Sequence, residues 1–274
     1  MAPATPVAAA TIMLMREAHD SQQATLEVLM LERHAKSQFL PDLYVFPGGR
    51  VDPGDHELAD RVRGLSPAEA QGRAHTVDAE SALGFYVAAI RETFEEAGVL
   101  LARRRGEDAL VAGSLAAELS AHRLDMQAGE VSFREIVLEH DLDLAADRLS
   151  VHGHWITPEI VPHRFDTLFF LAAAPEGHEA AHDGVESSNH VWIRPEDALA
   201  QARRKERQMI FPQVANLETI AGFSRVADVV ASSHARPVVP ITPKLAGDGD
   251  AKKLVIPDDA GYTTTEEKLE MPGR

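Results

Sequence analysis

The 274-residue sequence contains no cysteine, and this absence excludes several kinds of site at once. Disulfide bonds, thiolate metal ligands and cysteine nucleophiles all require that residue. A chain without cysteine is compatible with a reducing compartment, and we expect a cytoplasmic location.

Long hydrophobic runs are also missing, since no apolar stretch approaches the roughly 20 residues that a membrane-spanning helix needs. The short apolar run from Val7 to Met15 has no basic residue before it, unlike a signal peptide. We therefore predict a strand at this position and no membrane partner.

Basic residues are outnumbered, with 27 lysines and arginines against 43 aspartates and glutamates, for a formal net charge of −16. A field of this sign repels nucleic acid, phosphates and anionic membranes, so we expect no nucleic-acid partner. If the substrate is a phosphate ester, a local positive charge must reverse the field, and a divalent cation is the usual means.

The order of the expected elements indicates an α/β fold. Apolar runs predict two strands near the start of the chain, and shorter apolar segments predict four more. The strands are expected at 7–16, 26–33, 43–46, 150–158, 166–175 and 189–195. Helices are expected from Ser66, which has a capping-box pattern with Glu69, and over 195–206 and 211–223. This order predicts a mixed sheet packed between helices.

The domain organisation follows from changes in composition. Residues 1–236 are expected to form one domain, with an extra helical segment at about 56–80. From residue 237 the chain is rich in Pro, Gly, Asp and Thr. We interpret residues 237–274 as an extended tail that lies on the domain, with a hairpin around 247–250.

A longer helix is predicted over about residues 78–97. Val87, Ile90 and Phe94 give it one apolar stripe, which would anchor it on the sheet. Gly98 follows directly and is the residue type that most often ends a helix.

The same helix carries Glu92, Glu95 and Glu96 at positions i, i+3 and i+4, which lie on one helical face. Three carboxylates on a rigid helix suit a hard cation such as Mg²⁺, which prefers oxygen ligands and is commonly shared with phosphates. The alternative is a solvated acidic face on which Arg91 pairs with Glu95.

The segment RETFEEAGV, residues 91–99, resembles the end of the Nudix box, Arg-Glu-apolar-x-Glu-Glu-x-Gly-apolar. Thr93 stands where the family usually has an apolar residue. The box opens with Gly, five residues and Glu, and here Gly49 is followed six positions later by Asp55. On these residues the chain is similar to the Nudix hydrolase superfamily.

The two halves of this box are unusually far apart, because 35 residues separate Asp55 from Arg91 where the family places seven. An insertion whose own ends lie close bulges outward and moves neither half. One Nudix branch, which includes coenzyme A diphosphatases, has such an interrupted box, and FLPDLYVFPGG and residues 155–175 resemble it too. The resemblance implies a Nudix-type α/β/α sandwich around a mixed sheet, with a helical insertion in the box.

The implied reaction is hydrolysis of a pyrophosphate bond in a nucleoside diphosphate linked to another group, with Mg²⁺ or Mn²⁺ as cofactor. By the family pattern, Glu92, Glu95 and Glu96 supply metal ligands, and one of them or a loop glutamate acts as general base. Arg91 would orient a glutamate through an ion pair. Gly49 would offer its backbone carbonyl to the metal.

Other candidates have a structural alternative beside the functional one. Asp55 either contributes through a bound water or is purely structural. Glu186 is a candidate loop base or extra ligand, or else a solvated loop glutamate. Arg164 would hold a substrate phosphate, or would pair with Asp166 and shape the strand.

The substrate is the least determined part of the prediction. Gly48 lets the backbone approach the pyrophosphate, and Arg33 matches the first arginine of a coenzyme A signature that ends in FPGG. The rest of that signature is absent, because its other positions are occupied here by Ser37, Gln38, Leu40 and Asp42. Coenzyme A or an acyl derivative is favoured through the branch resemblance alone.

ADP-ribose and NADH-type dinucleotides are alternative substrates within the same reaction class. A non-catalytic Nudix-fold nucleotide-binding module is the rival from another class, and retention of all three helix glutamates argues against it. A monomer and a homodimer both remain open.

Overall fold

The computed structural model describes residues 3–20, 23–34, 42–74, 78–178 and 180–269. A mixed sheet forms its centre, with strand order β10-β7-β8-β1-β2-β3, while β4 pairs with β1 and β9 with β2. The pairs β1–β8 and β7–β10 are parallel and the other pairs are antiparallel. The strands are β1 Val7–Asp20, β2 Gln23–Arg33, β3 Tyr44–Val45, β4 Gly48–Arg50, β7 Ser150–Ile156, β8 Phe165–Ala173, β9 Ser187–Ile193 and β10 Pro240–Ile241.

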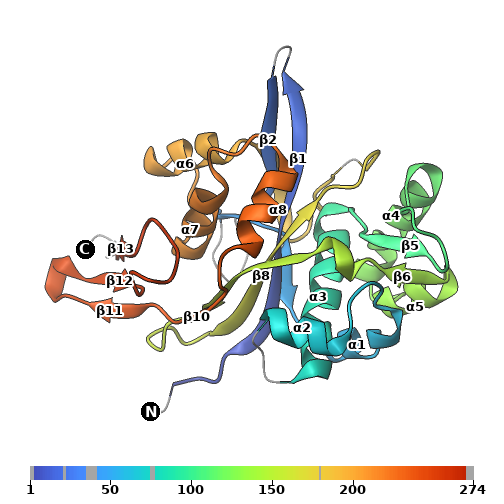
Figure 1. Cartoon of the computed structure of the whole chain (residues 1–274), viewed down its shortest axis with the longest axis horizontal. Coiled ribbons are helices and arrows are strands. Elements are labelled where there is room, and N and C mark those ends of the chain that lie inside the picture. Colours follow the sequence, from blue (N-terminus) through green and yellow to red (C-terminus); the bar gives the residue numbers. More distant parts are fainter. Residues whose placement is uncertain (1–2, 21–22, 35–41, 75–77, 179, 270–274) are drawn as a thin grey trace.

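The central strands are apolar on both faces, as expected for a sheet covered on both sides. In β1, Ile12 and Leu14 belong to one hydrophobic core, and Met13 and Met15 belong to the other. Figure 1 shows α2 to α5 on one side of this sheet, and α6, α7 and the last strands on the other. The predicted α/β/α sandwich around a mixed sheet is therefore confirmed.

Eight α-helices flank the sheet within the described residues. Five precede β7 in the chain: α1 Pro53–His56, α2 Pro67–Ala74, α3 Ala79–Ala97, α4 Gly113–Gln127 and α5 Phe133–Glu139. Three follow β9: α6 Pro195–Arg203, α7 Phe211–Ile220 and α8 Val226–His234. Two short strands that the sequence did not indicate, β5 Ala102–Arg104 and β6 Leu142–Leu144, pair antiparallel. Of the helices in these ranges, none is long and apolar enough to cross a bilayer.

Helix α3 matches the prediction closely. The Asp78 side chain caps its first turn by accepting a hydrogen bond from Ser81 N at 2.8 Å. Gly98 ends it with a left-handed φ of 71°, a conformation that glycine adopts without strain. The apolar stripe through Ile90 and Phe94 is fully buried against the sheet.

The segment inserted into the box contains a short 3-10 helix, Ala59–Arg61, and helix α2, joined by irregular residues. Ser66 and Glu69 form the expected capping box, with Glu69 N 3.3 Å from Ser66 Oγ and Ser66 N 2.8 Å from Glu69 Oε2. Ala70 and Ala74 of α2 are fully buried in the core that also contains α3. Residues 75–77 of the segment lie outside the described residues. The insertion thus packs against α3, the helix that carries Glu92, Glu95 and Glu96.

The last part of the chain packs against the hydrophobic core that contains Met13 and Met15 of β1. After β10, strands β11 Lys244–Ala246, β12 Lys253–Val255 and β13 Glu266–Lys268 form a small antiparallel sheet. Tyr262 is buried and its hydroxyl accepts a hydrogen bond from Trp155 Nε1 at 3.0 Å. The segment interpreted as an extended tail therefore contains its own sheet.

Candidate active site

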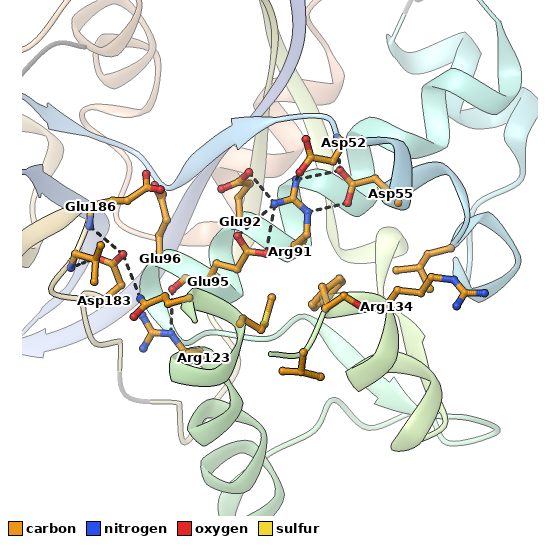
Figure 2. Close-up of a pocket in the computed structure, with 18 residues that line it drawn as sticks. Asp52, Asp55, Arg91, Glu92, Glu95, Glu96, Arg123, Arg134, Asp183 and Glu186 are labelled. Carbon is orange, nitrogen blue, oxygen red and sulfur yellow. Dashed lines mark hydrogen bonds and ion pairs between the residues drawn. The ribbon is translucent and has the colours of Figure 1, made fainter. Parts of the chain in front are cut away.

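The carboxylates of α3 face a pocket of about 510 Å³ that collects residues from four parts of the chain. Asp52 and Asp55 come from α1 and its start, Arg123 from α4, and Glu186 from the loop before β9. Figure 2 shows the acidic side chains of α3 directed toward the same space as Glu186. The fold thus places the two halves of the interrupted box beside one pocket.

The two glycines of the first half lie in a strand, whereas the strand predicted in this region ends at Phe46. Gly48 and Gly49 belong to β4, where they pair with Thr11 and Ala10 of β1. A Cβ atom at Gly48 would collide with the backbone of both β1 residues, so only glycine permits this close approach.

Each glycine contacts a different glutamate of α3. Gly48 N donates a hydrogen bond to Glu96 Oε2 at 2.9 Å. A Cβ atom at Gly49 would collide with the Glu92 carboxylate. Gly49 is therefore adjacent to Glu92, whereas the sequence predicts a position beside Glu95 and Glu96.

Arg91 is the centre of the hydrogen-bond network beside the pocket. Its Nη1 donates to Glu92 Oε1 at 2.9 Å and lies 3.3 Å from Glu95 Oε2. Its Nη2 donates to the backbone carbonyl of Arg50 at 2.8 Å. This geometry lets Arg91 orient both glutamates, which is the kind of role that the family resemblance implied.

Asp55 holds Arg91 from the other side. Its two carboxylate oxygens accept from Arg91 Nε at 2.8 Å and from Arg91 Nη2 at 3.0 Å. Asp55 Oδ2 also accepts from Asp52 N at 2.8 Å, and the residue is only 2% exposed. Because both oxygens are engaged, the structural alternative fits Asp55 better than a contribution to substrate binding through a bound water.

The carboxylates of α3 are held in an environment that disfavours their charged form. Burial raises the pKa of Glu92 to about 7; the Arg91 charge opposes this rise, and the charges of Glu95 and Glu186 add to it. Burial and then the charge of Glu92 hold the pKa of Glu96 well above its ordinary range, against the Gly48 hydrogen bond. A bound cation would offset this repulsion and favour the ionised form of the Glu92 and Glu96 carboxylates.

Glu186 belongs to a loop with a defined local structure. The Asp183 carboxylate accepts hydrogen bonds from Glu186 N at 3.1 Å, Ser187 N at 2.9 Å and Val185 N at 3.2 Å. Glu186 itself is exposed and lines the pocket, and its charge raises the pKa of Glu96. Asp183 was not predicted, although an aspartate before a glycine is typical of such turns.

The two arginines proposed to bind substrate have different positions. Arg33 on β2 does not line the pocket itself, but its charge lowers the pKa of Glu96, and its buried Nε has no hydrogen-bond partner in the described part of the chain. Arg164 does not line the pocket. Its Nε donates to Thr157 O at 3.0 Å and its Nη1 to Ala4 O at 2.8 Å, so its guanidinium holds backbone segments together. We therefore do not retain Arg164 as a substrate ligand.

Arg123 was missed by the sequence analysis. It is 8% exposed, and its Nε donates to the Glu95 carbonyl oxygen at 3.0 Å while its Nη2 donates to Ala181 O at 2.9 Å. These bonds tie α4 to the C-terminal end of α3 and to the loop that carries Glu186. No local pattern reveals such a role, because it depends on three segments meeting in space.

Comparison with known proteins identifies the family and supports the fold. The family model described as the NUDT19 Nudix domain matches residues 61–220, which is more than half of the chain. The chain belongs to this Nudix hydrolase family. A solved Nudix hydrolase from Alicyclobacillus acidocaldarius has a TM-score of 0.67 and 26% identity, and the match covers 83% of this chain and 96% of that one.

Two curated relatives carry the same name. The acyl-coenzyme A diphosphatase NUDT19 of Gallus gallus is 29% identical over 292 residues, covering 89% of this chain and 76% of that protein. The Homo sapiens protein of that name is 28% identical over 239 residues, covering 74% of this chain and 62% of that protein. The chain thus spans less than two thirds of the human relative.

Nudix hydrolases generally require divalent metal ions, so the oxygen atoms that line the pocket should suit such an ion. Within the described ranges, no three His, Asp or Glu side chains are already arranged around one cation position. Mg²⁺ does not need such a cage, because it keeps several waters and uses one or two carboxylates together with substrate phosphates. The buried, mutually repelling carboxylates of Glu92 and Glu96 match the chemistry of this ion.

Proposed function

We propose that this Nudix hydrolase cleaves the pyrophosphate bond of coenzyme A or an acyl-coenzyme A, with Mg²⁺ or Mn²⁺ as cofactor. The observation that carries the proposal is the convergence of Glu92, Glu95, Glu96 and Glu186 on one pocket beside the glycine strand. The coenzyme A part of the proposal is supported by the names of the relatives.

Glu95 and Glu96 are the proposed cation ligands, together with the backbone carbonyl of Gly49, and Glu92 is an alternative ligand. A bound divalent ion would supply charge neutralisation on the phosphate oxygens. Phosphoryl transfer depends mainly on positioning and electrostatics, so a rigid helix that presents these carboxylates suits the reaction.

Glu92 is the proposed general base, because its carboxylate lines the pocket beside the proposed cation ligands. Arg91 holds its carboxylate at 2.9 Å and thereby fixes its direction. Arg33 and the Gly48 backbone are proposed to face the substrate phosphates. Glu186 is the alternative base, and the pH–rate profiles of Glu92→Gln and Glu186→Gln distinguish the two assignments.

A substrate panel tests the proposal. Coenzyme A, octanoyl-coenzyme A, NADH, ADP-ribose and diadenosine polyphosphates are each incubated with Mg²⁺, with Mn²⁺ or with a chelator, and the products are identified. We expect cation-dependent cleavage of the coenzyme A compounds with the highest kcat/KM. Preferred cleavage of ADP-ribose or NADH would replace the substrate assignment, and no cleavage of any compound would favour the binding-module alternative.

The matched variants for this panel are Glu96→Gln and Glu118→Gln. Glu118 is an exposed glutamate on α4 that does not line the pocket, so its amide variant controls for the loss of one negative charge. Loss of cleavage in the first variant alone supports the placement of the site.

A further inference from the structure

The carboxylate of Glu186 reaches the pocket from a loop, whereas the other three glutamates of the site share helix α3. Between β8 and β9, the described residues 174–178 and 180–186 form no helix or strand. A site needs its groups placed to within about 0.5 Å, so a side chain on such a loop is useful only where other bonds hold the backbone. The bonds that hold this loop therefore decide where Glu186 points.

The carboxylate of Asp183 supplies three of these bonds. Its Oδ1 accepts from Val185 N at 3.2 Å and from Ser187 N at 2.9 Å, and its Oδ2 accepts from Glu186 N at 3.1 Å. Gly184 N closes the same turn by donating to Ser187 O at 3.1 Å. Hydrogen bonds to an ionised acceptor are roughly twice as strong as neutral ones. Asp183 therefore fixes the backbone on both sides of Glu186.

The turn is also tied to the rest of the fold. Gln127 Nε2, at the end of α4, donates to Asp183 Oδ2 at 3.4 Å, and Arg123 Nη2 donates to a backbone carbonyl of the same loop at 2.9 Å. On the other side, His34 N donates to the Glu186 carbonyl oxygen at 2.9 Å. Figure 2 shows Asp183 next to Glu186 at the edge of the pocket. The Asp183 carboxylate thus links α4 to the backbone that carries Glu186.

We propose that Asp183 is a positioning residue for the reaction, because it fixes the loop so that the Glu186 carboxylate faces the pocket beside α3. This inference rests on the proposed function, but not on the identity of the substrate or on whether Glu186 acts as base or as cation ligand. Both oxygens of Asp183 accept hydrogen bonds from the loop, so Asp183 does not itself act on the substrate. Its effect on the reaction therefore passes through Glu186.

A double-mutant cycle measures this dependence. The wild type, Asp183→Ala, Glu186→Gln and the double variant are compared by kcat and KM, with Mg²⁺ and the compound that the wild type cleaves best. Asp183→Ala should lower kcat by at least about tenfold, because misplacing a catalytic group by about 1 Å has effects of this size or more. Glu186→Gln should lower kcat at least as much. In that background Asp183→Ala should cost less than about twofold, since no carboxylate is left to position.

A conservative variant and a matched control accompany the cycle. Asp183→Asn keeps one oxygen for Val185 N and Ser187 N but places an amino group against Glu186 N, so its loss of kcat should lie between those of the wild type and Asp183→Ala. Asp147→Ala is the control, because the Asp147 carboxylate accepts two hydrogen bonds from Arg103 at 2.7 Å and does not line the pocket. Its kcat should be unchanged, and thermal melting checks that each variant is folded.

Amide hydrogen exchange tests the positioning without any activity measurement. Exchange at the Glu186 and Ser187 amides should become at least about tenfold faster in Asp183→Ala, because local opening of the turn is then no longer opposed by the carboxylate. In Glu186→Gln the same amides should exchange at the wild-type rate, since that change leaves the Asp183 hydrogen bonds in place.

The outcomes separate this inference from the proposed function. Equal losses of kcat from Asp183→Ala in both backgrounds would overturn the inference, because Asp183 would then act independently of Glu186. Unchanged kcat or unchanged amide exchange in Asp183→Ala would also overturn it and leave the proposed function standing. If the wild type cleaves no compound, the proposed function is contradicted, and the exchange rates alone decide whether Asp183 holds the loop. If Asp183→Ala does not fold, the same cycle with Asp183→Asn decides.

Discussion

Asp55 and Arg91 form a two-point ion pair, with Nε–Oδ1 and Nη2–Oδ2 distances of 2.8 and 3.0 Å. The pair joins the two halves of the interrupted Nudix box, which are separated by 35 residues in the chain. Arg91 in turn contacts Glu92 and Glu95. Despite the insertion, α3 is therefore attached to the first half of the box through Arg91 and through the hydrogen bond from Gly48 N to Glu96.

The first prediction concerns the stability of this connection. Asp55→Asn removes the charge that balances buried Arg91, and breaking one partner of a buried pair costs about 3 kcal/mol. Asp52→Asn is the matched control, since Asp52 is 61% exposed and 3.8 Å from Arg91, and its loss should stay below about 1 kcal/mol. Urea unfolding measures both. Equal free-energy losses in the two variants would contradict the assigned role of Asp55.

The second prediction separates stability from activity at Glu96. The raised pKa of Glu96 means that its ionised form is disfavoured in the folded state, so at pH 8 the neutral amide of Glu96→Gln relieves repulsion. We expect unchanged or increased stability in the presence of a chelator, together with a loss of at least about 100-fold in kcat/KM. Denaturant unfolding and initial rates test the two parts. A variant that is less stable and fully active would refute the assignment.

The third prediction uses two glycines of the same segment. A Cβ atom at Gly49 would displace the Glu92 carboxylate, whereas a Cβ atom at Gly54 meets nothing within 4 Å. Gly49→Ala should therefore lower kcat by at least about tenfold, because misplacing a catalytic group by about 1 Å has effects of this size or more. Gly54→Ala adds a methyl group to the pocket lining but displaces no carboxylate, so kcat should be unchanged, and stability should rise by about 0.5–1 kcal/mol because Gly54 lies within α1. Similar rates for both variants would count against a catalytic role for Glu92.

The fourth prediction is a pH dependence of folding from His152. Burial, and then the charge of Arg236, lower the pKa of His152 to about 3. The ring contacts Ser233 Oγ at 3.1 Å and Thr219 Oγ1 at 2.6 Å. In the unfolded chain its pKa is about 6.5, so below that pH the unfolded state alone takes up the proton. The stability contribution is therefore present above pH 6.5 and falls by about 1.4 kcal/mol per pH unit below it.

Urea unfolding of the wild type and of His152→Gln between pH 7.5 and 5 measures this effect. The stability difference between the two proteins should shrink as the pH falls, because the glutamine side chain does not titrate. A constant difference across this range would show that His152 takes up a proton as readily in the folded state as in the unfolded chain, which would contradict the lowered pKa.

The features that could be predicted from the sequence depend on local signals. Asp78 as cap, Gly98 as terminator and the 3.6-residue apolar period each act within a few residues of α3, so its bounds and its carboxylate face were correct. The Nudix motif then supplied the partner segment. The continuous apolar runs in β1 and β8 likewise identified two strands of the central sheet.

Other features depend on which segments meet in the folded chain. Gly48 and Gly49 have low strand propensity, and only their pairing with β1, about 40 residues earlier, makes them a strand. The spacing around Arg164 could not show that its guanidinium binds two backbone carbonyls. Arg123 acts between α4, α3 and a loop, and no sequence pattern describes such a contact.

The central claim is that the pocket beside α3 cleaves the pyrophosphate of a coenzyme A compound in a cation-dependent reaction. Mass spectrometry of the products from octanoyl-coenzyme A and Mg²⁺ tests it most directly. The account predicts adenosine 3′,5′-bisphosphate and the acylated phosphopantetheine arm, with formation stopped by a chelator and strongly reduced in Glu96→Gln but not in Glu118→Gln. Intact substrate, or free octanoate and coenzyme A from thioester hydrolysis, would contradict the account.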